Sequence, residues 1–391
     1  MDLDARIKRR QYRSGGPRLI QDYEPLSPVA HIEEPTNRGP VLERLLDHLD
    51  PVFDGRLPPN AYLHGPFGSG KSAIVQALIS HLQQLSTETQ SVIHTSTRVR
   101  SPSPPGFVYV DLRETQTGFA FYHTVLDALT EEPVPEHGIS TETLRTELRT
   151  VLGEERTGVV VAVDHVGEDT GTDDLVDLFA GLPSNMSWLA VGRADASDTL
   201  LSEYTATSIQ VDSYQPQMLV DVLMTRASEA LTQQALGHEL AREIANWADG
   251  SAYDALAALF IAADRANQEE RSRITEPDVT AAITEIPQPS VSLGRVLALP
   301  ANKQVVLRKL VDLDETERVS VTATTEAISS DPGVELSPGT VKRFLYEMAE
   351  IGIVERVQAS SRDGKGRPPS RVELRFPPTV FRRLYDLKNS E

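Results

Sequence analysis

The spacing of apolar and polar residues divides the chain into regions of different character. Between residues 61 and 191, short unbroken apolar runs alternate with helical periodicities, whereas from residue 216 to residue 285 only helical periodicities occur. Unbroken apolar strands are typical of parallel sheets with both faces covered. An α/β fold with a parallel sheet is therefore expected first, with strands at 61–64, 107–112, 159–164 and 188–191 and helices at 40–50, 73–78, 119–130 and 140–152.

The remainder of the chain is predicted to be helical, apart from one hairpin. Four helices are expected at 216–231, 238–249, 251–267 and 276–285, followed by a Pro-rich linker. The tail then gives helices at 301–313 and 321–329, a third helix that starts at Ser337-Pro338, strands at 353–359 and 371–376, and a closing helix at 379–388. Three helices and a hairpin in this order indicate a winged helix-turn-helix.

Two polar stretches are expected to lie outside these elements. Residues 1–20 carry six basic and two acidic side chains beside a Ser-Gly-Gly-Pro run, which predicts a basic flexible arm. Residues 86–105 are rich in Ser and Thr and end in alternating Ser and Pro, which predicts an exposed loop. The domains are then expected at 1–20 (arm), 21–212 (α/β domain), 213–286 (helical domain) and 287–391 (winged helix).

The most specific motif lies between the first predicted strand and the helix that follows it. It matches G-x-x-x-x-G-K-[ST] at every fixed position and consists of Gly65, Pro66, Phe67, Gly68, Ser69, Gly70, Lys71 and Ser72. Such a loop cradles phosphates with backbone N–H groups, while its lysine reaches the β- and γ-phosphates and its serine ligates Mg²⁺. Asp164, at the carboxyl end of an apolar strand, is the acid expected beside the Mg²⁺ ion. ATP or ADP with Mg²⁺, held through Ser72 and Asp164, is thus the predicted cofactor.

Composition narrows the class of protein. The net charge is −19, yet residues 291–391 carry 16 basic and 14 acidic side chains, so the tail is the expected nucleic-acid face. Only seven of the 38 basic residues are lysine, an acidic surface similar to that of proteins from salt-loving archaea; an ordinary acidic protein is the alternative. The absence of cysteine excludes disulfides and thiolate metal sites. With no apolar run of membrane length and no signal core, a cytoplasmic location and no membrane partner are expected.

In its motifs and their order the chain resembles the archaeal origin-recognition initiator ATPases, AAA+ proteins with a helical lid and a C-terminal winged helix. The stretches that carry the resemblance are Leu19–Pro25, Pro58–Gly65, His137–Ser140, Val211–Tyr214 with Leu219–Leu223, and the wing tip Gly364–Arg367. The resemblance implies an AAA+ domain, a lid and a winged helix that binds duplex DNA at origin repeats. It also implies that Tyr214 belongs to the nucleotide site, and it makes the replicative helicase a candidate partner.

Three accessory positions depart from the family pattern. The second acidic motif is normally Asp-Glu, but here it is Asp164-His165, with Glu168 nearby in sequence. The first sensor, usually Asn, falls near Gly192-Arg193. The lid arginine that touches the γ-phosphate is replaced by Tyr253. Loss of a water-orienting group or of a cation costs orders of magnitude in rate, so slow or absent hydrolysis is expected. In the alternative, His165 or Glu168 substitutes for the missing acid.

The DNA contacts are expected on the third tail helix and on the wing. The residues concerned are Lys342, Arg343, Arg362, Lys365 and Arg367, which would face phosphates, bases or a narrow minor groove. Two other functions remain open. The protein could be a regulator that binds promoters without firing an origin, or a signal-transducing NTPase whose winged helix docks proteins. The sequence leaves its oligomeric state open.

Overall fold

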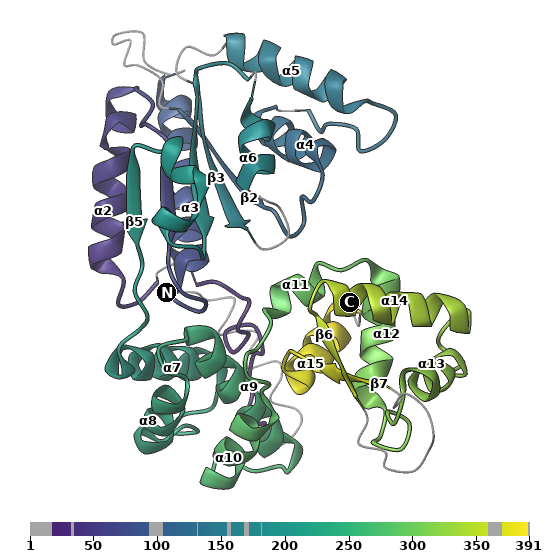
Figure 1. Cartoon of the computed structure of the whole chain (residues 1–391). Helices are drawn as coiled ribbons and strands as arrows, with labels where there is room; N and C mark the ends of the chain where they lie inside the picture. The colour runs from purple at the N-terminus through teal and green to yellow at the C-terminus, as the bar shows by residue number, and fades with distance from the viewer. Residues whose placement is uncertain are drawn as a thin grey trace. The chain divides into compact units, whose positions relative to one another are not determined.

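The computed structural model describes residues 18–32, 35–93, 105–130, 132–154, 158–167, 172–180, 182–358 and 370–389, and it divides into two compact units. One unit spans residues 31–214, and the other combines the N-terminal segment up to residue 30 with residues 215–391 (Figure 1). We call them the α/β unit and the helical unit. Residues 1–17, most of the predicted arm, lie outside the described residues.

The described part of the α/β unit is built on a parallel sheet in the order β2-β3-β4-β1-β5. The strands are β1 (Ala61–His64), β2 (Gly106–Asp111), β3 (Val159–Val166), β4 (Met186–Gly192) and β5 (Thr207–Gln210). The helices are α2 (Gly39–Leu49), α3 (Lys71–Ile93), α4 (Gly118–Leu129), α5 (Thr141–Glu154) and α6 (Thr172–Phe179). The parallel α/β fold predicted from the apolar runs is therefore confirmed.

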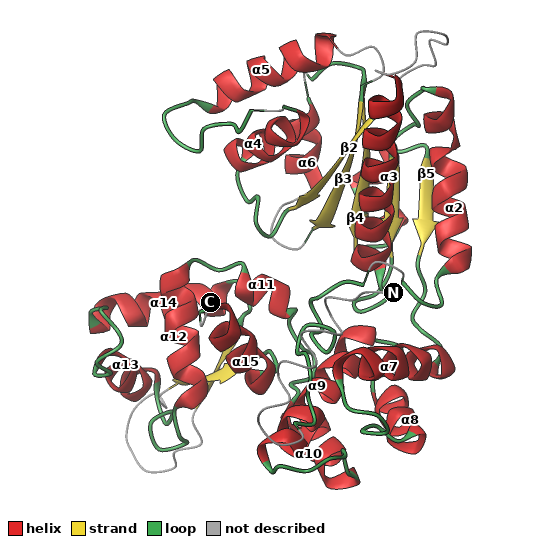
Figure 2. Ribbon diagram, turned by 180° about the vertical axis from the view of Figure 1, so that it is seen from behind, coloured by secondary structure: helices red, strands yellow, loops and turns green. Residues whose placement is uncertain are grey.

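Helices cover both faces of the sheet (Figure 2). Along β3, Val159, Val161 and Val163 pack into one core with α4 and α5, while Val160 and Ala162 pack into the other with α2 and α3. Alternate side chains of one strand thus enter opposite cores, which is why the run has no polar residue before its end. The carboxyl ends of β1, β3 and β4 consequently share one edge, and the motif residues lie there.

Some boundaries differ from those predicted. The polar stretch from residue 86 was expected to be a loop, but α3 continues through it to Ile93. The prediction was wrong there because Ser, Thr and Gln do not stop a helix that has already nucleated. Residues 71–101 contain neither Gly nor Pro, which would stop it. Two short helices and one strand were not predicted, namely α6, α11 (Leu293–Leu297) and β5. β5 has a single apolar residue, Ile209, and so gives no strand signal.

The helical unit begins with the lid helices α7 (Pro216–Ala230), α8 (His238–Trp247), α9 (Ala252–Gln268) and α10 (Glu276–Glu285). Most of α9 is buried, including two aspartates, so it is the central helix of this group. The N-terminal segment is part of the same unit. Ile20 forms a bridge with Leu231, and Arg226 donates to the carbonyls of Pro25 and Ala30.

The tail has the element order of a winged helix. It consists of α12 (Ala301–Asp312), α13 (Val321–Ser329), α14 (Pro338–Glu350), the antiparallel pair β6 (Val354–Gln358) and β7 (Ser370–Leu374), and α15 (Pro378–Lys388). Ser337 caps α14 by accepting a hydrogen bond from the Thr340 amide, as its sequence predicts. The domain boundaries given above remain predictions.

One buried acid in the lid gives a pH-dependent prediction. Asp278 accepts from Nη1 and Nη2 of Arg271 and closes a capping box with Thr275. Burial opposes its ionisation, but these hydrogen bonds outweigh burial and lower the pKa of Asp278 to about 2. A depressed carboxyl pKa stabilises the fold above the unfolded-state value near 4, and this stability is lost as the pH falls toward 2.

We therefore expect Asp278→Asn to lower stability at pH 7 by about 1–2 kcal/mol. The difference from the parent should shrink as the pH falls from 4 toward 2, because the parent carboxyl then gains its proton. Urea unfolding at pH 7 and at pH 3, with exposed Asp47→Asn as the control, measures it. A penalty that does not change with pH would contradict the ionic origin of the effect.

Candidate functional site

The phosphate loop joins β1 to α3 and curls around the ammonium group of its own lysine. Lys71 is 8% exposed, and its Nζ donates to the carbonyls of Gly65 and Pro66, at 2.7 Å each, and to Ser69 Oγ at 3.2 Å. Gly68 and Gly70 take positive φ values of 72° and 83°, a conformation that glycine adopts without strain. The loop thus turns tightly around the Lys71 ammonium group and leads into α3, with Ser72 in the first turn of that helix.

The segment after β5 passes directly against this loop. A Cβ on Gly65 would stand 2.1 Å from the Val211 carbonyl oxygen, and one on Gly70 would stand 2.6 Å from the Tyr214 hydroxyl. Both positions therefore require glycine. Tyr214, which was predicted through the family resemblance, lies beside the phosphate loop.

Arg38 completes this side of the loop. Its guanidinium stacks on the Tyr214 ring, 3.5 Å from the centroid. Arg38 is 7% exposed, and its Nε and Nη2 have no hydrogen-bond partner among the described residues. The stack on Tyr214 therefore stabilises the guanidinium charge. Sequence reasoning missed Arg38, because a lone arginine before an amphipathic helix carries no motif.

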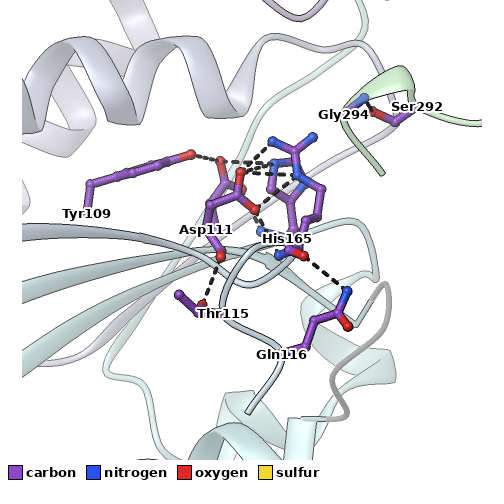
Figure 3. A network of polar contacts seen from close by, with 9 residues as sticks. Tyr109, Asp111, Thr115, Gln116, His165, Ser292 and Gly294 are labelled. Atoms are coloured by element: carbon purple, nitrogen blue, oxygen red, sulfur yellow. Dashed lines mark hydrogen bonds and ion pairs between the residues drawn. The ribbon is translucent and has the colours of Figure 1, made fainter. Parts of the chain in front are cut away.

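Asp164 ends the apolar run of β3 and is 2% exposed. Tyr109, Asp111 and His165 lie in the same polar network (Figure 3). The Tyr109 hydroxyl, from β2, donates to its Oδ2 at 2.8 Å, and the His165 amide donates to its Oδ1 at 2.7 Å. Burial and the charges of Asp164 and Asp111 raise the pKa of Tyr109 far above its ordinary value, so the phenol stays a donor. Both oxygens of the carboxylate are thus fixed in direction.

His165, at the position where the resemblance implies a glutamate, faces two carboxylates. Its backbone is left-handed, with φ 65°, and its Nε2 lies 3.6 Å from Asp164 Oδ2 and 3.9 Å from Asp111 Oδ2. A left-handed residue other than glycine stores strain. Glu168, the alternative acid, lies outside the described residues.

Asp111 and Arg113 were not predicted to belong to this site. Asp111 pairs with Asp164 in the register of β2 and β3, and Arg113 Nε donates to both of its oxygens, at 3.0 and 3.1 Å. Burial opposes ionisation of Asp111, but the hydrogen bonds and charge of Arg113 outweigh it and lower the pKa of Asp111. The signal in the sequence was a second predicted strand ending near Asp111, with the basic residue Arg113 two residues later.

The other two altered positions also have defined surroundings. Arg193, one residue beyond β4, places its guanidinium 4.5 Å from the centroid of the Phe67 ring in the phosphate loop. Tyr253 lies in the first turn of α9, and its hydroxyl donates to the Val291 carbonyl at 3.2 Å and accepts from the Leu293 amide at 2.9 Å. Arg193 therefore contacts the phosphate loop within its own unit, whereas Tyr253 holds the start of the tail.

The predicted DNA-contacting residues are described only in part. Lys342 and Arg343 are exposed on α14, and Arg343 is 3.6 Å from Glu347 and packs against the Phe344 ring. Tyr346, on the same helix, lies within cation–π distance of both Lys342 and Arg356 of β6. The wing residues Arg362, Lys365 and Arg367 lie outside the described residues, so their arrangement stays a prediction.

Two kinds of feature are not found in the part of the chain that the structure describes. Among these residues no group of three or more His, Cys, Asp or Glu side chains is arranged to hold a metal ion. None of the described helices is long and apolar enough to cross a membrane.

Comparison with known proteins agrees with this architecture. The family described as AAA ATPase domain matches residues 34–191, and the Cdc6 AAA+ ATPase-type lid domain matches residues 220–284. The ORC1-type DNA replication protein of Thermococcus onnurineus is 24% identical over 370 residues, covering 88% of this chain and 85% of its own length. ORC1-type DNA replication protein 1 of Aeropyrum pernix is 24% identical over 391 residues, covering 94% and 92%.

A solved structure extends the likeness to the whole fold. The Aeropyrum pernix ORC1 protein, solved in complex with DNA, superimposes with a TM-score of 0.61 at 21% identity and covers 95% of this chain and 97% of its own. Two family domains in the expected order, relatives matched over nearly their full length and this shared fold agree with one another. The chain belongs to the Cdc6/ORC1-type family of AAA+ ATPases.

Proposed function

We propose that this protein binds ATP or ADP and acts as a replication-initiator-like protein that binds origin duplex DNA through its winged helix and AAA+ domain. The bound nucleotide acts as a conformational switch and is not hydrolysed rapidly. The observation that carries this proposal is an intact phosphate cradle beside three altered accessory positions. Lys71 is enclosed by the loop, whereas His165, Arg193 and Tyr253 stand where the resemblance implies other side chains.

The residues at the cradle fit a magnesium–nucleotide complex. Magnesium is usually held by one or two protein oxygens together with phosphate oxygens and waters, so a large cluster of acids is not required. Ser72 supplies a hydroxyl in the first turn of α3, and Asp164 supplies a buried carboxylate whose two oxygens are fixed by Tyr109 and by the His165 amide. The metal would neutralise phosphate charge there.

Replacing Tyr109 by phenylalanine tests this assignment. We expect Tyr109→Phe to raise the Mg²⁺ concentration needed for half-maximal ATP binding about tenfold, because Asp164 loses the donor that orients it. Titration of Mg²⁺ against a fluorescent ATP analogue measures the shift. Tyr204→Phe, which removes a half-exposed hydroxyl on the same unit, is the control. An unchanged magnesium requirement would remove Tyr109 and Asp164 from the metal site.

Hydrolysis is proposed to be slow. The imidazole of His165 stands against two carboxylates, and no carboxylate at residue 165 remains to orient an attacking water. An ordinary enzyme turns over at about 1 s⁻¹ or faster. Purified protein in molar salt should therefore hydrolyse ATP much more slowly than that. Brisk turnover that is lost in His165→Ala would instead show that the histidine replaces the missing acid.

The DNA-binding part of the proposal rests on exposed cations on α14 and on the relatives described above. A DNA-binding regulator with the same fold is the second candidate, favoured by the altered accessory positions. Fluorescence anisotropy with labelled duplexes, with and without ADP, tests duplex binding itself. Failure to bind any duplex would favour the third candidate, an NTPase whose winged helix docks proteins.

A further inference from the structure

The residue in the place of the lid arginine is used for another purpose in this chain. Tyr253 is 6% exposed, and its hydroxyl both donates to the Val291 carbonyl and accepts from the Leu293 amide. Both partners lie beyond the Pro-rich linker, at the start of the tail. The single hydroxyl therefore satisfies two backbone groups of the segment that leads into α11, a task that phenylalanine could not perform.

A second tie joins three segments that are distant in sequence. Asp264 of α9 is 1% exposed and accepts from Tyr23 at 2.7 Å, from Gln268 at 2.6 Å and from Arg383 of α15 at 2.8 and 3.1 Å. A buried carboxylate that lacks such partners is strongly unfavourable. Separating Asp264 from these donors would therefore destabilise the protein. The N-terminal segment, the lid and the last helix of the tail thus meet at one charge.

A third contact lies at the beginning of the same tail helix. Glu285, the last residue of α10, accepts from the Thr379 amide of α15 at 2.9 Å, which places an acid at a helix N-terminus. α15 also packs against α9, as both views of the chain show (Figures 1 and 2). The lid and the tail are therefore joined by side-chain ties on two lid helices as well as by the linker between them.

We propose that Tyr253, Asp264 and Glu285 are positioning residues that lock the winged-helix tail to the lid, so that the two turn as one body. An arginine at residue 253 could not serve as the hydroxyl acceptor for the Leu293 amide. Any change of lid pose would then carry α14 with it. This inference rests on the proposed function only in naming the tail as the DNA-contacting part.

Spin labels provide a direct test, since the chain has no cysteine of its own. Cysteines introduced at exposed Glu243 of α8 and Glu326 of α13 report the lid-to-tail distance by pulsed electron resonance. The full chain should give one narrow distance distribution whose width does not change when ADP is added. Tyr253→Phe with Arg383→Gln should broaden that distribution about twofold or more. This pair leaves Asp264 bonded to Tyr23 and Gln268, so the buried acid keeps partners.

The matched control changes the same residue types on the tail alone. Tyr385→Phe with Arg382→Gln lies on α15, where Arg382 bonds within the tail to Asp312 and Val311, and it should keep the distribution narrow. The single variants Tyr253→Phe and Arg383→Gln should each broaden it by an intermediate amount. A parent distribution as broad as that of the double variant, or a double variant as narrow as the parent, would overturn the lock. The comparison of the parent with its variants needs neither nucleotide nor DNA, so failure of the proposed function would leave that comparison unaffected.

Discussion

Lys71→Ala is expected to weaken ATP and ADP binding at least about 100-fold, which corresponds to roughly 2.7 kcal/mol. The ammonium group of Lys71 lies inside the phosphate loop and contacts two of its carbonyls and Ser69. Removal of the lysine eliminates the cation that would meet the β- and γ-phosphates, and charge-assisted hydrogen bonds of this kind are the strong ones. Calorimetric titration with ADP in molar salt measures the change.

The control for this variant is Lys388→Ala, which removes an exposed lysine near the end of α15 without touching the loop. It should bind ADP as the parent does. Thermal unfolding in the absence of nucleotide should be similar in both variants, while stabilisation by excess ADP should disappear only in Lys71→Ala. Equal ADP affinity in Lys71→Ala and in the parent would refute the phosphate site.

The second large effect is expected on DNA. Reversing both exposed charges of α14, in Lys342→Glu with Arg343→Glu, should weaken duplex binding by about 100-fold or more at moderate salt. Each lysine or arginine that contacts a phosphate releases about one counterion, so the slope of log affinity against log salt should also fall by about 2. Anisotropy titrations over a range of KCl concentrations give both quantities.

The matched control reverses the same number of charges elsewhere. Arg56→Glu with Lys388→Glu changes the net charge equally at two exposed positions outside α14. It should leave the salt slope nearly unchanged, because no specific phosphate contact is lost. Equal losses in both double variants would show that bulk charge, and not α14, governs binding. No loss in either variant would remove α14 from the DNA interface.

Local patterns sufficed to predict most of the fold. β3 is recognisable because its unbroken apolar side chains pack alternately into two cores. α14 is recognisable because Ser337 and Pro338 mark its start. β5 and the end of α3 could not be predicted in this way. β5 is held as a strand by pairing with β1, and α3 continues through polar residues that resemble a loop. Tertiary pairing and helix propagation, rather than composition, decide both cases.

The part of the site that is one contiguous motif could be predicted from the sequence. The residues that strand pairing brings to the site were missed. The phosphate loop is predicted from eight consecutive residues, and its lysine lies inside the loop. Tyr109 lies on the neighbouring strand β2 and Arg113 lies two residues beyond its end, and both reach the site through the register of β2 with β3, which the sequence does not display. Arg38, just before α2, is brought to Tyr214 from far away in the sequence. Such partners become visible only once strand order is known.

The central claim is that a nucleotide-binding member of this family binds DNA at origins. Genome-wide mapping of DNA cross-linked to the protein, comparing the parent with Lys71→Ala, tests it most directly. We expect peaks at repeats beside replication start sites in the parent and their loss in the variant. Peaks confined to promoters, peaks that survive in Lys71→Ala, or no peaks at all would contradict it.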